Sequence, residues 1–214
     1  VLAMDLKNSE PFYRSRAEQD QDDASDNLVT LWRSHMYAAL LRRQGVVLQK
    51  KGDELLIFFD ADRCGDPVAQ AVAAFDDMAQ ASKLLEAELK RLGLFPSGVQ
   101  SLSFRAALTE GRIRPTWESF GSERQPYWEE AGDTSPFVEC SRLMEMERGV
   151  LGDANTRNRT LLILSEIQAA GLVTRAAALS SRFVARAQPG RDKRGQTHSL
   201  AVIEYIINSN SYNT

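Results

Sequence analysis

Short apolar runs and longer segments with helical spacing alternate along the first part of this chain. The opening run Val1–Met4 stops at Asp5, which predicts a buried strand that ends in a carboxylate. After a polar, acidic stretch, apolar residues recur every three or four positions from 27 to 44 and stop before Gly45. This spacing predicts a long helix that ends at the glycine.

The next segment has the pattern of a β-hairpin followed by a second helix. Val46–Leu48 and Leu55–Phe59 are apolar runs on either side of a polar break, and Gly52 suits the tight turn between them. The same turn carries a second carboxylate, Asp53. From 66 to 92 the apolar positions again follow a helical period, so we expect a long helix whose apolar stripe covers a sheet.

Shorter elements are predicted along the rest of the chain. Residues 101–108 alternate well enough for a strand, whereas 109–132 is polar, rich in turn residues and without a clear period, which predicts a long loop or a hairpin. The remaining expected elements are a helix over 137–146, strands over 160–164, 183–187 and 200–207, and a helical turn or two over 165–170.

The order of these elements is β-α-β-β-α-β followed by a smaller αβ extension. This order is typical of the α+β fold called ferredoxin-like or split βαβ, in which an antiparallel sheet has helices on one face. No internal repeat or linker divides the chain, so residues 1–214 are expected to form a single domain. The first strand and the hairpin are neighbours in this fold. Asp5 and Asp53 should therefore meet at one edge, which favours a site for a hard cation.

Composition narrows the classes of function. The chain has 214 residues, 43% of them hydrophobic, and 26 basic against 29 acidic residues give a net charge of −3. This balance does not favour a nucleic-acid partner, which needs a basic surface. No apolar run approaches the roughly 20 residues that cross a bilayer, so no membrane partner is expected. Cys64 and Cys140 lack the spacing of a disulfide framework or a zinc site, and the expected location is cytoplasmic.

Five short segments occur in an order that is found in one known family. They are Met4–Ser9, Gly52–Asp53 between two strands, Arg105–Gly111, Cys140–Leu143 and Lys193–Gly195 before a final strand. Met4–Ser9 resembles the first metal motif of class III nucleotidyl cyclases, and Gly52–Asp53 resembles their metal-binding hairpin. Arg105–Gly111 is similar to the strand before the mid-domain glycine of that family. Cys140–Leu143 is similar to its arginine helix, and Lys193–Gly195 to its closing motif. This family comprises the catalytic domains of adenylate and guanylate cyclases, and the resemblance spans nearly the whole chain.

The resemblance implies cyclisation of a nucleoside triphosphate, in which the ribose 3′-hydroxyl attacks the α-phosphate and pyrophosphate leaves. Two Mg²⁺ or Mn²⁺ ions support this chemistry in the family. It implies Asp5, Asp53 and the backbone of Leu6 as metal ligands. The residues that follow, Lys7, Asn8 and Ser9, are implied to hold the β- and γ-phosphates.

The second half of the chain supplies the implied cationic groups. Arg142 would stabilise the charge that develops on the transferred phosphate, and Lys193 or Arg194 would bind the triphosphate. Because the family takes its carboxylates and its arginine from different subunits, the resemblance also implies a head-to-tail homodimer. The alternative for Arg142 is a surface salt bridge to Glu139 or Glu145 on the same helix.

The chain departs from the family at two positions. Gln49 stands four residues before Asp53, where adenylate-making members have a lysine and guanylate-making members have a glutamate. An amide both donates and accepts, so Gln49 is expected to pair with uracil and the predicted reaction converts UTP to cyclic UMP, with cyclic CMP next. Val138 stands where the family has a transition-state asparagine, which favours the second hypothesis below.

Two hypotheses of function follow. The first is an active cyclase similar to the pyrimidine cyclases of bacterial Pycsar anti-phage systems, whose cyclic nucleotide is read by a downstream effector. An adenylate cyclase that makes cyclic AMP is the alternative within this class. The second hypothesis is a cyclase-homology domain that binds a nucleotide or a partner as a sensor without turnover. Retention of Asp5, Asp53 and Arg142 favours the active enzyme.

Overall fold

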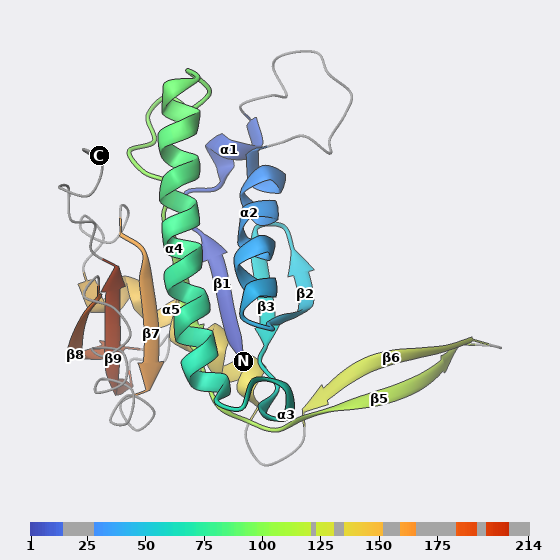
Figure 1. The fold of residues 1–214 in the computed structure, drawn as a ribbon. Coiled ribbons are helices and arrows are strands. Elements are labelled where there is room, and N and C mark those ends of the chain that lie inside the picture. Colours follow the sequence, from blue (N-terminus) through green and yellow to red (C-terminus); the bar gives the residue numbers. More distant parts are fainter. Residues whose placement is uncertain are drawn as a thin grey trace.

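A seven-stranded sheet forms the centre of the structure, a computed structural model that describes residues 1–14, 28–120, 123–130, 135–151, 159–165, 183–191 and 196–205 (Figure 1). Its strands are β1 (Leu2–Leu6), β2 (Val46–Lys51), β3 (Glu54–Phe58), β4 (Phe104–Leu108), β7 (Leu161–Ser165), β8 (Phe183–Arg191) and β9 (Thr197–Tyr205). They lie in the order β2-β3-β1-β4-β7-β9-β8, and neighbours run antiparallel except β4 and β7. The first four strands in this order have the split βαβ topology, which confirms the predicted fold class.

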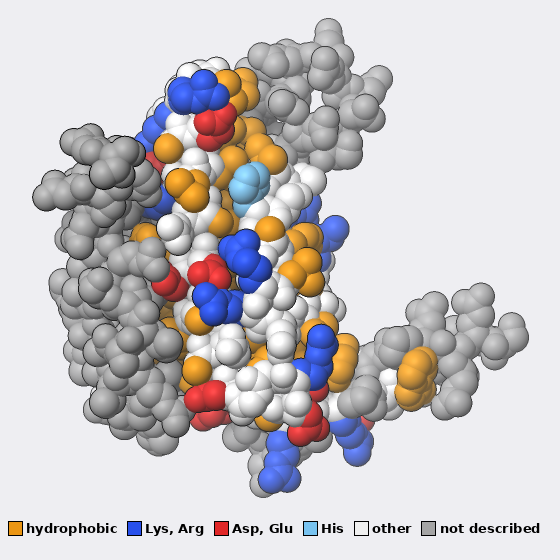
Figure 2. Space-filling view, viewed as in Figure 1, with side chains coloured by type: hydrophobic (Ala, Val, Ile, Leu, Met, Phe, Trp, Pro, Cys, Tyr) orange, Lys and Arg blue, Asp and Glu red, His pale blue; other side chains and the backbone are white. Residues whose placement is uncertain are grey.

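Two long helices, α2 (Leu28–Arg42) and α4 (Pro67–Arg91), pack side by side on one face of the sheet (Figure 1). The helical periods predicted both of them to within about two residues. The first turn of α4 is well defined because the Asp66 carboxylate accepts from the backbone N–H of Ala69 at 3.0 Å. The outward face of this pair carries both signs of charge (Figure 2), including the Arg43–Asp77 pair at 2.8 Å.

The helix predicted over 137–146 is longer, and it packs on the opposite face of the sheet. This helix, α5 (Pro136–Leu151), forms a second core with Ala3, Ala107 and Ile163, whereas Leu2 and Met4 belong to the core beneath α2 and α4. The side chains of β1 therefore alternate between two buried layers, which is why the strand reads as an almost continuous apolar run.

The stretch from 109 to 132, for which a loop or a hairpin was expected, contains a hairpin. Its strands β5 (Ile113–Phe120) and β6 (Glu123–Glu130) form a separate two-stranded sheet that extends away from the body (Figure 1). At its base the Trp128 ring packs on the Phe58 ring of β3, with 5.6 Å between the centroids. Just before it, a Cβ on Gly111 would lie 2.7 Å from the Pro136 side chain, so only glycine fits where the chain passes α5.

Several details lay beyond the sequence pattern. The helices α1 (Glu10–Arg14) and α3 (Ala61–Cys64) are too short to show a period. The strands β8 and β9 extend past their predicted bounds at one end, and β4 begins three residues after the predicted start. The helical turn expected over 165–170 falls almost entirely on residues that the structure does not describe. Among the described helices, none is long and apolar enough to cross a membrane.

Candidate active site

Asp5 lies on the sheet face that α5 covers, two positions beyond the buried Ala3. It pairs in register with Arg105 of the neighbouring strand β4. The Nε and Nη2 groups of Arg105 donate to Oδ2 of Asp5 at 3.0 and 2.6 Å, and both side chains are about three-quarters buried. A carboxylate can occupy a strand of this kind because a guanidinium at the same level compensates its charge.

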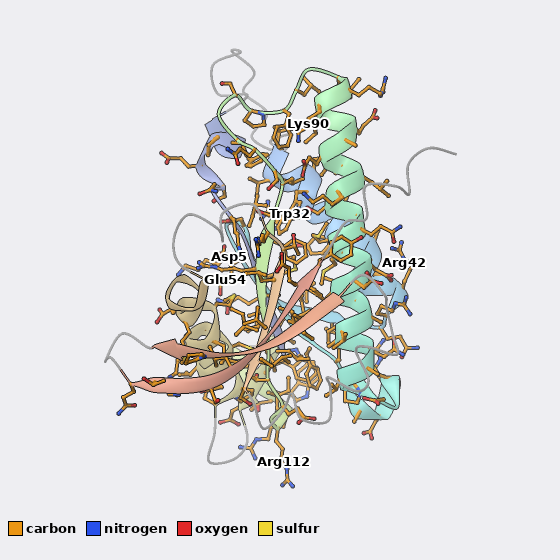
Figure 3. All side chains as sticks on the ribbon, turned by 90° about the vertical axis from the view of Figure 1, so that its left-hand side faces the viewer. Asp5, Trp32, Arg42, Glu54, Lys90 and Arg112 are labelled. Atoms are coloured by element: carbon orange, nitrogen blue, oxygen red, sulfur yellow. The ribbon has the colours of Figure 1, made fainter. Side chains whose placement is uncertain are left out.

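Asp53 approaches the same carboxylate from the β2–β3 turn. Burial raises the pKa of Asp5 to about 6; Arg105 opposes this shift, whereas the charge of Asp53 and a side-chain hydrogen bond to it add to the shift. The structure therefore brings Asp5 and Asp53 together, although 48 positions separate them in the sequence. Figure 3 shows that Glu54, the first residue of β3, also lies beside Asp5 on the adjacent strand.

The turn that carries Asp53 has two residues. β2 ends at Lys51 and β3 begins at Glu54, and these two residues pair across the turn. Gly52 has a φ of 60°, whereas Asp53 has a negative φ. One left-handed residue at the first central position is the geometry of a type II′ turn, which requires glycine there.

A β-bulge determines which way Gln49 faces. The register of β2 against β3 shifts between Val47 and Gln49, so that Gln49 pairs with Leu56 and not with Leu55. Residues that pair directly in antiparallel strands share a face. Because Leu56 contacts the α5-side core, the bulge turns Gln49 to the same face as Asp5 and Arg105.

Hydrogen bonds to neighbouring segments and one local bond hold the segment that follows β1. The Leu6 side chain is buried, and the backbone N–H of Lys7 donates to the carbonyl of Ser103 at 2.9 Å. The Lys7 ammonium donates to the carbonyl of Arg159 at 2.8 Å, so this side chain is directed toward the loop before β7. Asn8 has a φ of 51°, a left-handed conformation that asparagine tolerates well, and the Ser9 carbonyl accepts from the N–H of Phe12.

The predicted cationic groups of the second half do not join this cluster within the described residues. Arg142 is exposed on α5, and its Nη1 donates to Oε2 of Glu139 at 3.0 Å, which is the surface salt bridge that the sequence offered as the alternative. Val138, beside it, is also exposed. Lys193 and Arg194 lie outside the described residues.

Arg105 is the site residue that sequence reasoning missed as a functional group. One signal was available, because Arg105 is the single charged residue of the strand sequence FRAAL. A charge in a buried strand needs a partner, so the arginine itself indicated a carboxylate nearby. Which carboxylate it meets depends on the register of β1 and β4, whose paired residues lie 100 positions apart.

The carboxylate pair fits a hard divalent cation in its chemistry. Within the described ranges, no group of three or more His, Cys, Asp or Glu side chains is placed to hold a metal ion. Mg²⁺ in nucleotide enzymes commonly binds through one or two carboxylates, with water and substrate phosphate oxygens completing the shell. Asp5 and Asp53, with the backbone carbonyl of Leu6 next to them, match that donor set. A cation would also offset the burial and the repulsion from Asp53 that together raise the pKa of Asp5.

No family model and no curated protein matches this chain. Among solved structures, the guanylyl cyclase Cya2 matches over 99% of this chain and 93% of its own, with a TM-score of 0.56 and 17% identity. The adenylyl cyclase CyaB from P. aeruginosa matches over 98% of this chain and 93% of its own, with a TM-score of 0.60 and 13% identity. The dimeric guanylyl cyclase domain of the RhoGC fusion protein from Blastocladiella emersonii matches over 95% of this chain and 93% of its own, with a TM-score of 0.54 and 14% identity. The chain therefore has the fold of the adenylyl and guanylyl cyclase catalytic domains.

Proposed function

We propose that this chain is a nucleotide cyclase that converts a nucleoside triphosphate to a 3′,5′-cyclic nucleotide and pyrophosphate. The observation that carries the proposal is the meeting of Asp5 and Asp53 beside Arg105 on a cyclase fold. Two Mg²⁺ or Mn²⁺ ions at this pair would neutralise the triphosphate and activate the ribose 3′-hydroxyl.

The residues of this chain have separate roles in the proposal. Asp5 and Asp53 hold the cations, and Arg105 holds Asp5 in place while it adds positive charge beside the triphosphate. The backbone of Leu6 to Ser9 faces the β- and γ-phosphates, with the left-handed Asn8 allowing the chain to turn there. The Lys7 ammonium, which donates to the Arg159 carbonyl, assists at the phosphates in this proposal, since an ammonium carries three donors.

We propose that the base binds on the α5-side face of β2 and β3. Gln49 lies there next to Leu56, which offers an apolar surface beside an amide that both donates and accepts. Uracil has a carbonyl and an N–H at one edge, so UTP is the proposed substrate and cyclic UMP the proposed product. A cyclic-nucleotide-sensing effector and a role in anti-phage defence extend the same proposal, by likeness to the pyrimidine cyclases.

The site is completed, in this proposal, by a second copy of the chain arranged head to tail. Arg142 pairs with Glu139 on the surface, an interaction that contributes little and leaves the guanidinium accessible to a partner's phosphate. The projecting β5–β6 hairpin supports a dimer, because an isolated two-stranded sheet is marginal in water. Its Trp117 side chain is 56% exposed, which leaves a large aromatic surface for a partner to cover.

The direct experiment is incubation of the protein with each of the four nucleoside triphosphates and Mn²⁺, followed by chromatography of the products. Cyclic UMP and pyrophosphate in equal amounts are the expected result. A thermal shift with nucleotide but no cyclic product from any of the four would favour the non-catalytic sensor, which the exposed Val138 in place of an asparagine supports.

A further inference from the structure

Arg33 reaches from the helix layer to the turn that carries Asp53. Its Nη1 donates to the carbonyl oxygen of Gly52 at 2.7 Å, and its Nη2 donates to Oγ1 of Thr30, one turn earlier on α2, at 3.0 Å. Its Nε is buried and has no hydrogen-bond partner in the described part of the chain. A buried N–H without a partner is unfavourable, so its presence in a folded protein calls for an explanation.

The carbonyl that Arg33 contacts belongs to the peptide unit between Gly52 and Asp53. In a two-residue hairpin turn this unit has two orientations, which correspond to the type I′ and type II′ turns. A flip from one to the other leaves φ of Gly52 positive but changes φ of Asp53 from negative to positive. The flip therefore changes the direction in which the Asp53 carboxylate leaves the backbone.

We propose that Arg33 is a positioning residue for Asp53: it holds the Gly52–Asp53 peptide in the orientation that directs the carboxylate toward Asp5. A hydrogen bond from a charged donor is stronger than one between neutral groups, so this contact favours one orientation of the peptide over the other. The anchoring bond to Thr30 directs the guanidinium, and the unpaired Nε is explained as the cost of reaching the turn. The inference rests on the proposed metal site, and it adds a residue of α2 to it.

The test measures Mn²⁺ binding to the full chain without nucleotide, by electron paramagnetic resonance of free Mn²⁺. Outer-shell partners of metal ligands typically change affinity by 10–100-fold, and we expect Arg33→Gln to weaken Asp53-dependent Mn²⁺ binding by about tenfold. Arg33→Lys keeps a charged donor on a long side chain and should retain most of the affinity. The matched control is Arg43→Gln, one residue past the end of the same helix, which loses the ion pair to Asp77 and should bind Mn²⁺ normally.

A double variant separates positioning from general damage. In the Asp53→Asn background, Arg33→Gln should cause no further loss of Mn²⁺ binding, because the ligand that it positions is gone. Unchanged affinity in Arg33→Gln, or an equal loss in Arg43→Gln, would overturn the inference while leaving the metal site in place. Binding that depends on both Asp53 and Arg33, in a protein that makes no cyclic nucleotide, would support the inference and reject the cyclase. Absence of any Asp53-dependent binding would reject both.

Discussion

Asp5 occupies a position where an unpaired charge would be unfavourable. The strand LAMDL is buried around it, and Arg105 and Asp53 meet its side chain from two different elements. Burial raises the pKa of Asp5 to about 6, because the Arg105 guanidinium 2.6 Å away offsets this effect only in part and the charge of Asp53 adds to it. A strongly perturbed carboxyl beside a second carboxyl is typical of functional sites.

The first prediction concerns Asp53. Asp53→Ala should lower cyclase turnover by at least about a hundredfold, because one of the two carboxylates that hold the cations is lost. The turn itself depends on Gly52, so the fold should remain and circular dichroism should be unchanged. Turnover would be measured with UTP and Mn²⁺.

The control for this variant is Asp62→Ala, which removes a carboxylate from the short helix α3 and should leave turnover unchanged. Near-normal activity of Asp53→Ala would contradict the assignment of the active site to this edge of the sheet.

The second prediction concerns the base. A lysine is implied as the adenine-reading group of the adenylate-making relatives, and replacing a charged partner of a buried base edge changes discrimination by about tenfold to a hundredfold. With all four triphosphates at equal concentration, the unchanged protein should make mainly cyclic UMP. Gln49→Lys should move the product ratio toward cyclic AMP by about tenfold.

The product ratio, and not the total rate, decides this prediction. Mainly cyclic AMP or cyclic GMP from the unchanged protein would contradict the assignment of Gln49, even with the metal site intact.

At the scale of elements, Glu86 connects α4 to the segment before β4. Its carboxylate accepts from Lys83 at 2.8 Å, from Lys90 at 2.6 Å and from the backbone N–H of Leu102 at 2.9 Å, and the side chain is 12% exposed. Burial alone would raise the pKa of Glu86, but these three donors outweigh it and hold the pKa below its usual value of 4.5.

The third prediction follows from that lowered pKa. The ionised carboxylate stabilises the fold above pH 4.5, and this stabilisation is lost as pH falls through the folded-state pKa. Glu86→Gln should lower the free energy of unfolding by about 1–3 kcal/mol at pH 7, and the difference should narrow in acid. Urea denaturation at pH 7 and pH 3.5 would measure it.

Glu88→Gln is the matched control, because Glu88 pairs with Arg91 on the exposed side of the same helix and should change stability little. A constant difference between Glu86→Gln and the unchanged protein at the two pH values would contradict the prediction.

The large elements could be predicted because each leaves a period or a turn residue in the sequence. The two long helices and the β2–β3 hairpin have both, which is enough to give the split βαβ order. For β5–β6 the sequence does not distinguish a hairpin from a loop, because these strands mix prolines, charges and aromatics. Their pairing depends on cross-strand matches such as Trp117 with Pro126. The bulge before Gln49 leaves no pattern, since the extra residue falls at Leu48, where a short apolar run meets a polar one and there is no alternation to interrupt.

Some contacts of the candidate site could likewise be predicted from the sequence, and others could not. The meeting of Asp5 and Asp53 could be predicted, because the split βαβ order makes β1 the neighbour of the hairpin. The contact of Arg105 with Asp5 depends on strand register, and the contact of Arg33 with Gly52 depends on how α2 crosses the sheet. Neither the strand register nor the crossing of α2 over the sheet can be read from the spacing of residues along the chain.

At the scale of the whole molecule, the fourth prediction concerns assembly. If one chain supplies Asp53 and the other supplies Arg142, a mixture of Asp53→Ala and Arg142→Ala proteins contains heterodimers with one intact site. Each variant alone should be inactive. The mixture should recover up to about a quarter of normal activity, the share expected for random subunit exchange with one working site per heterodimer.

Light scattering and exchange of a labelled subunit would confirm that heterodimers form. A mixture that stays inactive after confirmed exchange would show that each chain carries its whole site.

The position of β1 also affects how the chain is made. β1 lies between β3 and β4, and both partners follow it in the sequence, β4 about a hundred residues later. At ribosomal speeds of about 5–20 residues per second, this apolar strand waits roughly 5–20 seconds for its last partner with at least one edge unpaired. During that interval Leu2–Leu6 is the segment that a chaperone would shield. Substitutions that make β1 more prone to aggregate can therefore reduce the yield of folded protein without changing its final stability.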